Sequence, residues 1–334
     1  MNRTLTLAAA LATAATAASA AGVNVYSYRQ PELIQPLIDA FEEQTGHTVN
    51  TVFLEEGMLE RLRAEGDRSP ADLVFTVDIS RLTELKEAGL TQPVESAILL
   101  DNIPAEMRDA DNHWFGLTAR ARLIYASKER VDEGEVTTYE DLASDKWQGR
   151  ICTRPGTHVY TLGLISAMIA HHGEEYTKEW LQALKENLAR KPQGNDTSQI
   201  KAIWAGECDI SLGNSYYLAG MLKNDEQKEW AESVRVAFPE FEDGGTHMNI
   251  SGMAMTKASP NRETAVELME FLASPEGQKI YAEINSEYPV LASVEPSELV
   301  QSWGAMERDT LSLNEIAEHR AAALRLVEEV GFDN

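Results

Sequence analysis

Basic residues are scarce in this chain of 334 residues, since 29 Lys and Arg stand against 54 Asp and Glu, with a formal net charge of -25 at pH 7. Phosphates would meet a repelling field, so the charge excludes a nucleic-acid-binding surface. Cysteine is scarcer still, with two residues, which excludes a mini-protein held by several disulfides. The 43% of hydrophobic residues predict a folded chain, and the length predicts two lobes.

The signature motifs of several enzyme classes are missing. The sequence has no G-x-S-x-G, G-x-G-x-x-G or G-x-x-x-x-G-K-[ST], which are typical of serine hydrolases, dinucleotide enzymes and nucleoside triphosphatases. The seven histidines show neither H-E-x-x-H nor paired-cysteine spacing, which disfavours zinc. We interpret the adjacent His171 and His172 as surface residues at a helix junction rather than as metal ligands.

Long hydrophobic runs are absent too. The N-terminus combines a basic start at Arg3, an uncharged Leu/Ala/Thr run over 5–18 and the small residues Ala18-Ser19-Ala20. This order predicts a secretory signal peptide in residues 1–20, because a spanning helix needs roughly 20 strongly apolar residues. No cysteine near the cleavage site could carry a lipid. We therefore expect an exported protein that is soluble once the signal is removed.

Export changes how the two cysteines are interpreted. In an oxidising compartment Cys152 and Cys208 can pair, and the bond would stabilise the fold by roughly 3 to 5 kcal/mol in the chain-entropy model. The alternative is two buried free thiols. A catalytic cysteine is disfavoured, because neither residue has an activating neighbour in the sequence. We predict a disulfide.

Strand and helix patterns alternate along the chain. Residues 23–28 alternate as a strand does, and Pro31 then opens a helix whose apolar residues recur at helical spacing until Gly46. Asp196 is predicted to cap the helix at 198–205. Further strands are predicted at 49–54, 73–77, 115–126, 150–154, 208–212 and 250–255, and further helices at 58–66, 176–188, 198–205, 261–272, 275–284 and 316–330. The alternation predicts parallel α/β sheets, and two lobes joined by continuous strands would enclose a hinged cleft.

Tyrosines follow two of these strands. Tyr160 lies eight residues beyond Cys152, and the pair Tyr216-Tyr217 begins eight residues beyond Cys208. If the disulfide joins neighbouring strands, it brings the three phenols towards one place, provided that the chain turns before Tyr216. By spacing alone, a tyrosine pair is more often used for packing with one hydrogen bond than for binding a metal.

Seven segments, taken in order, cover nearly the whole mature chain and carry a family resemblance. They are Tyr26-Ser27-Tyr28-Arg29-Gln30-Pro31, Ser69-Pro70-Ala71-Asp72 with Thr76-Val77-Asp78, residues 114–122, Lys191-Pro192-Gln193-Gly194-Asn195-Asp196, Gly213-Asn214-Ser215-Tyr216-Tyr217, residues 245–252 and Glu287-Tyr288-Pro289-Val290. In these segments the chain resembles the periplasmic ferric-iron-binding proteins of ABC importers.

The resemblance implies a two-lobed α/β fold of the type II periplasmic-binding-protein class. Each lobe would be a mixed sheet flanked by helices, with hinge strands between the lobes. The N-terminal lobe would comprise residues 21–118 and 243–290. The C-terminal lobe would comprise residues 119–242 and 291–334.

The resemblance also implies a site. Tyr160, Tyr216 and Tyr217 match the positions of tyrosine ligands for Fe3+. Many members add a His or a fourth Tyr after the first strand, but here that turn reads Arg29-Gln30-Pro31. The chain is therefore similar to the subgroup in which a carbonate or bicarbonate anion completes the coordination. Arg29 and Arg120 match positions near that anion, and Arg122 is a weaker candidate.

The implied protein is a carrier and not an enzyme. It would be a periplasmic monomer that delivers ferric iron to an inner-membrane ABC permease. A hard ferric ion prefers anionic oxygen, which phenolates supply. One alternative is a binding protein for a polyamine, thiamine or an organic anion. Another is an exported iron-dependent enzyme, for which Asp78 and Glu55 are the nearest general bases.

Overall fold

The computed structural model describes residues 21–334, so the predicted signal peptide lies outside the described residues. Its first half is built on three parallel strands in the order β2-β1-β3. Parallel neighbours require crossover connections, and helices provide them here. The elements are β1 (Gly22–Ser27), α1 (Pro31–Thr45), β2 (Thr48–Phe53), α2 (Met58–Glu65), η1 (Gly66–Arg68) and β3 (Leu73–Thr76). The helix predicted from Pro31 to Gly46 is confirmed, and it ends at Gly46 with a left-handed φ of 73°.

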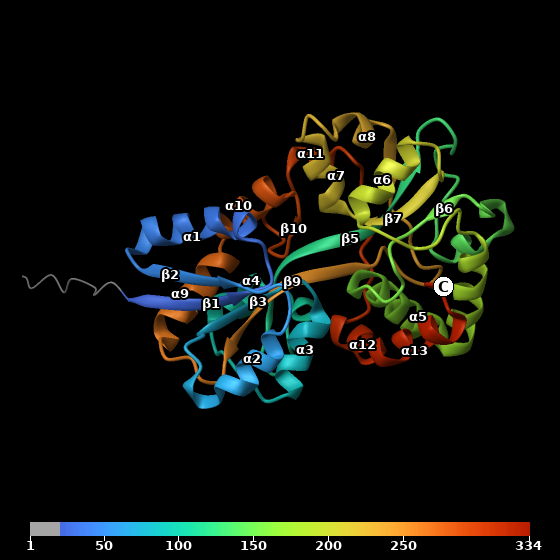
Figure 1. The fold of residues 1–334 in the computed structure, drawn as a ribbon. Helices are drawn as coiled ribbons and strands as arrows, with labels where there is room; N and C mark the ends of the chain where they lie inside the picture. The colour runs from blue at the N-terminus through green and yellow to red at the C-terminus, as the bar shows by residue number, and fades with distance from the viewer. Residues whose placement is uncertain (1–20) are drawn as a thin grey trace, which may run out of the picture.

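Two long antiparallel strands, β5 (Phe115–Ser127) and β9 (Met248–Thr256), run through the middle of the molecule. The first part of β5 pairs with β9 and with β10 (Tyr288–Pro289), and β9 in turn pairs with β3. The second part of β5 pairs with β7 (Ile210–Asn214) and β8 (Val234–Ala237). Every residue of β5 is buried. The two lobes are therefore joined through β5, which pairs with strands of both, rather than by a loose linker (Figure 1).

Helices cover the sheets of both lobes (Figure 1). Around the first half lie α3 (Ile79–Glu87), β4 (Thr91–Gln92), α4 (Ala97–Asn102), η2 (Ala105–Met107), α9 (Arg262–Ala273) and α10 (Pro275–Asn285). The second half contains η3 (Glu140–Ala143), η4 (Asp145–Trp147), β6 (Ile151–Cys152), α5 (Val159–Glu186), α6 (Asp196–Trp204), α7 (Ser215–Leu222), α8 (Lys228–Glu232), α11 (Glu298–Gln301), α12 (Leu313–Glu318) and α13 (Arg320–Val330). No helix within residues 21–334 has the length and apolar character needed to cross a membrane.

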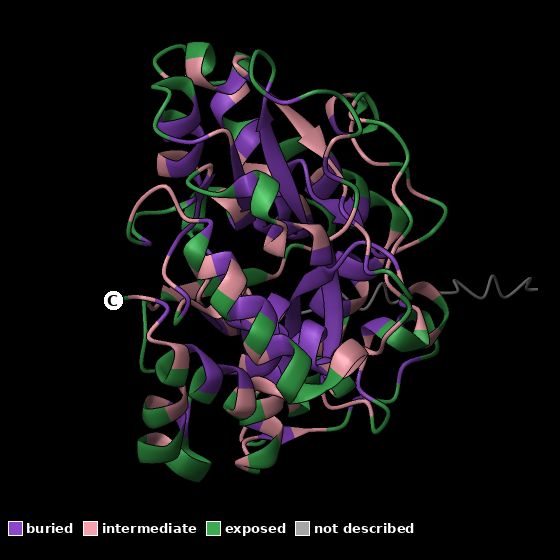
Figure 2. Ribbon diagram, turned by 90° about the vertical axis from the view of Figure 1, so that its right-hand side faces the viewer, coloured by how far each residue is buried: buried purple, intermediate pink, exposed green. Residues whose placement is uncertain are grey.

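The central strands form the interior, and the outer helices carry the exposed residues (Figure 2). One large hydrophobic cluster extends through both halves of the chain. A second, smaller cluster surrounds Cys152 and Cys208. These cysteines form a disulfide, with their Cα atoms 5.8 Å apart, as the sequence predicted.

The alternation predicts parallel sheets, but the sheet is mixed, because β5 and β9 pair antiparallel with all their neighbours. The structure also differs from the expected elements at four places. The predicted helix 176–188 is the second part of α5, which bends at Gly173, where φ is 81°. The predicted helix 316–330 is divided at His319 into α12 and α13. The strand predicted at 150–154 comprises two residues. Asp196 does not cap α6, because Asn195 accepts the hydrogen bond from the Ser198 amide at 3.0 Å. The lobe boundaries given above remain a prediction.

Candidate metal centre

The three tyrosines lie at helix starts. Tyr160 is in the first turn of α5, where the His158 side chain caps the helix by accepting a hydrogen bond from the Tyr160 amide at 3.1 Å. Tyr216 and Tyr217 are in the first turn of α7, which begins directly where β7 ends. In a helix neighbouring side chains point about 100° apart, whereas in a strand they point to opposite faces. This helix start permits the convergence that a straight strand would forbid.

The hydroxyl oxygens of Tyr160 and Tyr216 are 3.2 Å apart. The ring of Tyr217 stacks on that of Tyr216, with centroids 4.5 Å apart. An octahedral cation with bonds of about 2 Å separates neighbouring ligand oxygens by about 3 Å, so the hydroxyl spacing suits a small ion. The disulfide lies behind this arrangement, because β6 and β7 are parallel neighbours that lead towards the two tyrosine helices.

Burial raises the pKa of the Tyr216 and Tyr217 phenols, which favours their protonated forms in the absence of a cation. Desolvation raises the pKa of Tyr216 well above its usual value, and negative charge on Tyr160 or Tyr217 would raise it further, while Arg120 opposes the shift. The pKa of Tyr217 is raised by burial, then by Asp196 and Tyr160. Ionising these groups together therefore requires a concentrated positive charge between them.

Two buried guanidinium groups converge beside the tyrosines. Arg29 and Arg120 both donate to the Ser251 hydroxyl, at 3.0 and 3.2 Å. Arg29 also forms an ion pair with Glu287, and Arg120 donates to the Val77 carbonyl. The guanidinium of Arg120 lies 5.2 Å from the centre of the Tyr160 ring. Glu287 offsets the charge of Arg29, whereas Arg120 has no carboxylate partner within residues 21–334 and so places a positive charge beside Tyr160.

These arginines retain unused hydrogen-bonding capacity. Within residues 21–334, the Nε atoms of Arg29 and Arg120 are buried without a hydrogen-bond partner. Burial disfavours the charged form of Arg29, but Glu287 more than offsets this and raises its pKa. Arg29 therefore remains a cation, and an anion is the natural partner for the free donors of the two arginines.

A third group of charges lies beneath the tyrosines. The fully buried Asp196 accepts hydrogen bonds from Arg122 and Arg154, each at 3.0 Å, and from the Asn214 amide at 2.8 Å. The guanidinium of Arg154 is 5.0 Å from the centre of the Tyr160 ring. Arg122 is therefore engaged by Asp196 and also by the Asn214 side chain.

Comparison with known proteins identifies the family. Residues 36–308 match the family model described as bacterial extracellular solute-binding protein. The chain belongs to this family. It is 42% identical, over 93% of its length and 87% of the relative's, to iron uptake protein A1 of Synechocystis sp.. It is 50% identical to the ferric iron-binding protein A of Mannheimia haemolytica solved in an open conformation, with a TM-score of 0.90 over 94% of this chain and all of that one.

A third similar protein comes from Trichodesmium and was solved with iron and citrate ligands. It is 40% identical to this chain, with a TM-score of 0.89 over 93% of this chain and 99% of that one. These likenesses confirm the type II periplasmic-binding-protein fold. They also agree with the prediction that this solute-binding protein is a carrier and not an enzyme.

Asp78, His171 and His172, which were considered for other chemistry, have structural partners in this solute-binding protein. Asp78 caps α3 by accepting from the Ser80 amide at 2.9 Å, and it also accepts from Asn249 at 2.7 Å. Glu55 is exposed. The interpretation of His171 and His172 as surface residues is wrong, because their side chains are only 5% and 16% exposed. His171 contacts Asp243 and Asp309, and His172 contacts Glu140, all within 3.0 Å. Within residues 21–334 no group of three or more His, Cys, Asp or Glu residues could hold a metal ion.

Sequence reasoning missed the polar residues that orient the arginines. Ser251 and Glu287 lie within segments that carry the resemblance, but nothing in their spacing pairs them with Arg29, which is more than 200 residues away. The position of Asp196 before a helix predicts a helix cap, whereas the structure places it between Arg122 and Arg154. The excess of arginines near the site was the available signal, since a buried guanidinium requires acceptors.

Proposed function

We propose that this solute-binding protein binds ferric iron through the phenolates of Tyr160, Tyr216 and Tyr217, with a carbonate-type anion at Arg29 and Arg120. The observation that carries the proposal is the 3.2 Å separation of the Tyr160 and Tyr216 hydroxyl oxygens beside two arginines that share one hydroxyl. Relatives named for ferric iron binding and iron uptake support it.

The charges of such a site balance. Three phenolates offset the three positive charges of the ion, which prefers hard anionic oxygen. The ion ionises the phenols as metals ionise bound water. Because burial raises the pKa of Tyr216 and Tyr217, binding of the ion to their phenolates releases protons, and the affinity should fall on acidification. Reduction to the ferrous ion would weaken binding by lowering the charge.

The anion would occupy the side of the ion that faces the arginines. Arg29 and Arg120 each keep a buried Nε donor without a partner in the described residues. The start of α1, directly after Arg29, adds partial positive charge. Carbonate or bicarbonate offers several oxygens to the ion and to these donors at once. Gln30 or a water molecule could then supply any remaining ligand.

Closure of the lobes would accompany binding. The Nζ atom of Lys223, at the end of the helix that carries Tyr216 and Tyr217, donates to the Ser286 hydroxyl at 3.2 Å and to the Glu283 carbonyl at 3.3 Å, at the end of α10. These contacts join the two sides of the cleft. We infer that the closed, iron-loaded monomer is the form that an inner-membrane ABC permease recognises from the periplasm.

The absorption spectrum tests the proposal. Purified protein given ferric citrate and bicarbonate should develop a phenolate-to-iron charge-transfer band, and Tyr216→Phe and Tyr217→Phe should each shift or abolish it. Tyr176→Phe is the matched control, because Tyr176 is exposed on α5 away from the other tyrosines. A protein that stays colourless while binding an organic solute contradicts the proposal. Catalytic turnover by the iron-loaded protein would favour the enzyme alternative.

A further inference from the structure

A pocket lies behind the hinge strands β5 and β9, and no tyrosine of residues 21–334 lines it. Its volume is about 340 Å3. Met248 and Ile250 of β9 line it. Ser251, which accepts hydrogen bonds from Arg29 and Arg120, points to the other face of the same strand. The pocket therefore backs onto the strand whose opposite face forms part of the candidate metal centre.

The walls of this rear pocket come from separate parts of the chain. Met107 of η2 forms one wall, and Leu313 and Ile316 of α12 form another. The segment 308–311 completes it and is bound to the hinge through Thr246, which exchanges backbone hydrogen bonds with residues 307 and 309. Because α12 contacts both α3 and α5, the pocket is bordered by elements on both sides of the hinge.

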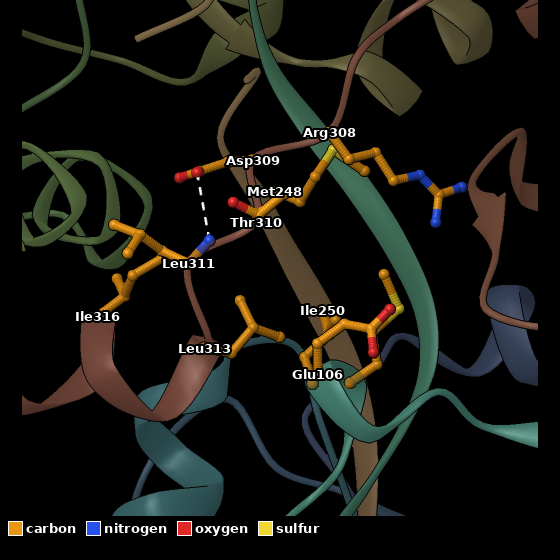
Figure 3. Close-up of a pocket in the computed structure, with 10 residues that line it drawn as sticks. Glu106, Met248, Ile250, Arg308, Asp309, Thr310, Leu311, Leu313 and Ile316 are labelled. Carbon is orange, nitrogen blue, oxygen red and sulfur yellow. Dashed lines mark hydrogen bonds between the residues drawn. The ribbon is translucent and has the colours of Figure 1, made fainter. Parts of the chain in front are cut away.

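The pocket has an apolar end and a charged end. Figure 3 shows Leu311, Leu313 and Ile316 on one side, with Arg308 and Glu106 on the other. This is the composition of small-molecule sites, which are mostly apolar with a few polar groups that fix orientation. A volume of about 340 Å3 falls within the usual range of such sites, roughly 300–1,000 Å3.

The two charged groups are open to a ligand. Within residues 21–334, the side chains of Arg308 and Glu106 form no hydrogen bond and no ion pair with other residues. Arg308 lies 5.8 Å from the centre of the Tyr288 ring, and burial lowers its pKa. The neighbouring Asp309 is already engaged, since it accepts from the Leu311 amide at 3.3 Å and contacts His171 at 3.0 Å. A cation and an anion thus border one end of an apolar cavity.

We propose that the rear pocket binds a free α-amino acid with an apolar side chain. Its carboxylate would pair with Arg308 and its ammonium group with Glu106. Its side chain would contact Met248, Leu313 and Ile316. A simple carboxylate would leave Glu106 unpaired and repelled, and a simple amine would do the same to Arg308. A zwitterion satisfies both charges.

Methionine methyl groups provide a direct assay of binding. In protein labelled with 13C-methyl methionine, L-leucine should shift the NMR signals of Met107 and Met248 in a saturable way. Met58, which lies on α2 outside the pocket, should not move. Glycine, which lacks the apolar part, and 4-methylpentanoate, which lacks the ammonium group, should bind more weakly. Unmoved Met107 and Met248 signals, or equal binding of 4-methylpentanoate, would overturn the proposal.

Two variants test the charged end separately. Arg308→Gln should weaken L-leucine binding about tenfold or more, as expected when a charge-assisted hydrogen bond is lost. Glu106→Gln should weaken it while hardly affecting the fold, because Glu106 is exposed. Arg320→Gln is the matched control, since Arg320 carries the same charge on α13 outside the pocket. Unchanged affinity in both pocket variants would refute the assignment of the charged end.

Because the rear pocket lies behind the hinge, L-leucine binding should also affect iron binding, which provides a second test. Opening of the cleft by rotation about β5 and β9 would separate Lys223 from Ser286 and narrow the rear pocket on the opposite side. L-leucine in the rear pocket would oppose this narrowing. L-leucine should therefore favour the closed form, raise the iron affinity, and be bound more tightly by iron-loaded protein by the same factor. This readout depends on the proposed function, whereas the NMR titration without iron does not. Equal L-leucine affinity with and without iron would refute the coupling but leave the site.

Discussion

Replacing Asp196 by Asn should destabilise the protein strongly. Asp196 is fully buried and pairs with two guanidinium groups, Arg122 and Arg154, at 3.0 Å each. The variant keeps the shape of the side chain but removes the negative charge, which leaves two buried cations with a neutral partner. Removing one partner of a buried ion pair typically costs about 3–5 kcal/mol. We expect a loss of this size in the free energy of unfolding.

The Asp196→Asn substitution should also disturb the metal centre. Asp196 accepts from the Asn214 amide, directly before the helix that carries Tyr216 and Tyr217. A shifted helix start would move their hydroxyls relative to Tyr160, so the charge-transfer band of the iron-loaded variant should be weaker or displaced. A stability effect alone would leave the band of the folded fraction unchanged.

Urea unfolding of the metal-free protein, followed by circular dichroism, measures the stability. Asp111→Asn is the control, because Asp111 also pairs with a basic residue but has a side chain that is 75% exposed. It should leave the unfolding midpoint close to that of the wild type. If Asp196→Asn lowers the free energy of unfolding by less than about 1 kcal/mol, the assigned role of the buried pair is wrong.

Three further predictions concern other sites. Replacing Cys152 and Cys208 by Ala opens a loop with a sequence separation of 56 residues and should cost about 4 kcal/mol, measured by urea unfolding with and without a reductant. A stability loss below about 1 kcal/mol would contradict the entropic account. Arg29→Gln should lower the iron affinity in bicarbonate buffer more than in buffer free of carbonate, and equal losses would argue against its contact with the anion. Asp309 and Asp243 raise the pKa of His171 despite its partial burial, so its stabilisation should be complete below about pH 6.5 and disappear as the pH rises through its folded pKa. His171→Gln should therefore destabilise more at about pH 5.5 than at about pH 9, and a pH-independent difference would refute this reasoning.

Local patterns predicted much of the fold. The helix from Pro31 to Gly46 has a proline start, a regular apolar spacing and a left-handed glycine, so each local signal agrees. The disulfide followed from export and from there being two cysteines. The approach of Tyr160 to Tyr216 could be expected only on the condition that the chain turns before Tyr216, and α7 supplies that turn.

Long-range polar pairs were outside the reach of the sequence. Asp196 lies 74 residues from Arg122 and 42 from Arg154, and no local pattern joins them. Arg308 and Glu106, at the charged end of the rear pocket, are about 200 residues apart in the sequence. Such contacts depend on how complete sheets are placed against each other, which periodicity does not encode.

The continuity of β5 through both lobes, with β9 paired beside its first part, limits how the chain can be divided. A fragment that ends before β9 would lack the strand that lies between β3 and β5, and the buried faces of both neighbours would meet water. Neither half should therefore persist as an independent folded piece. Two separately produced fragments should regain native structure only when they are mixed and reassemble around these strands.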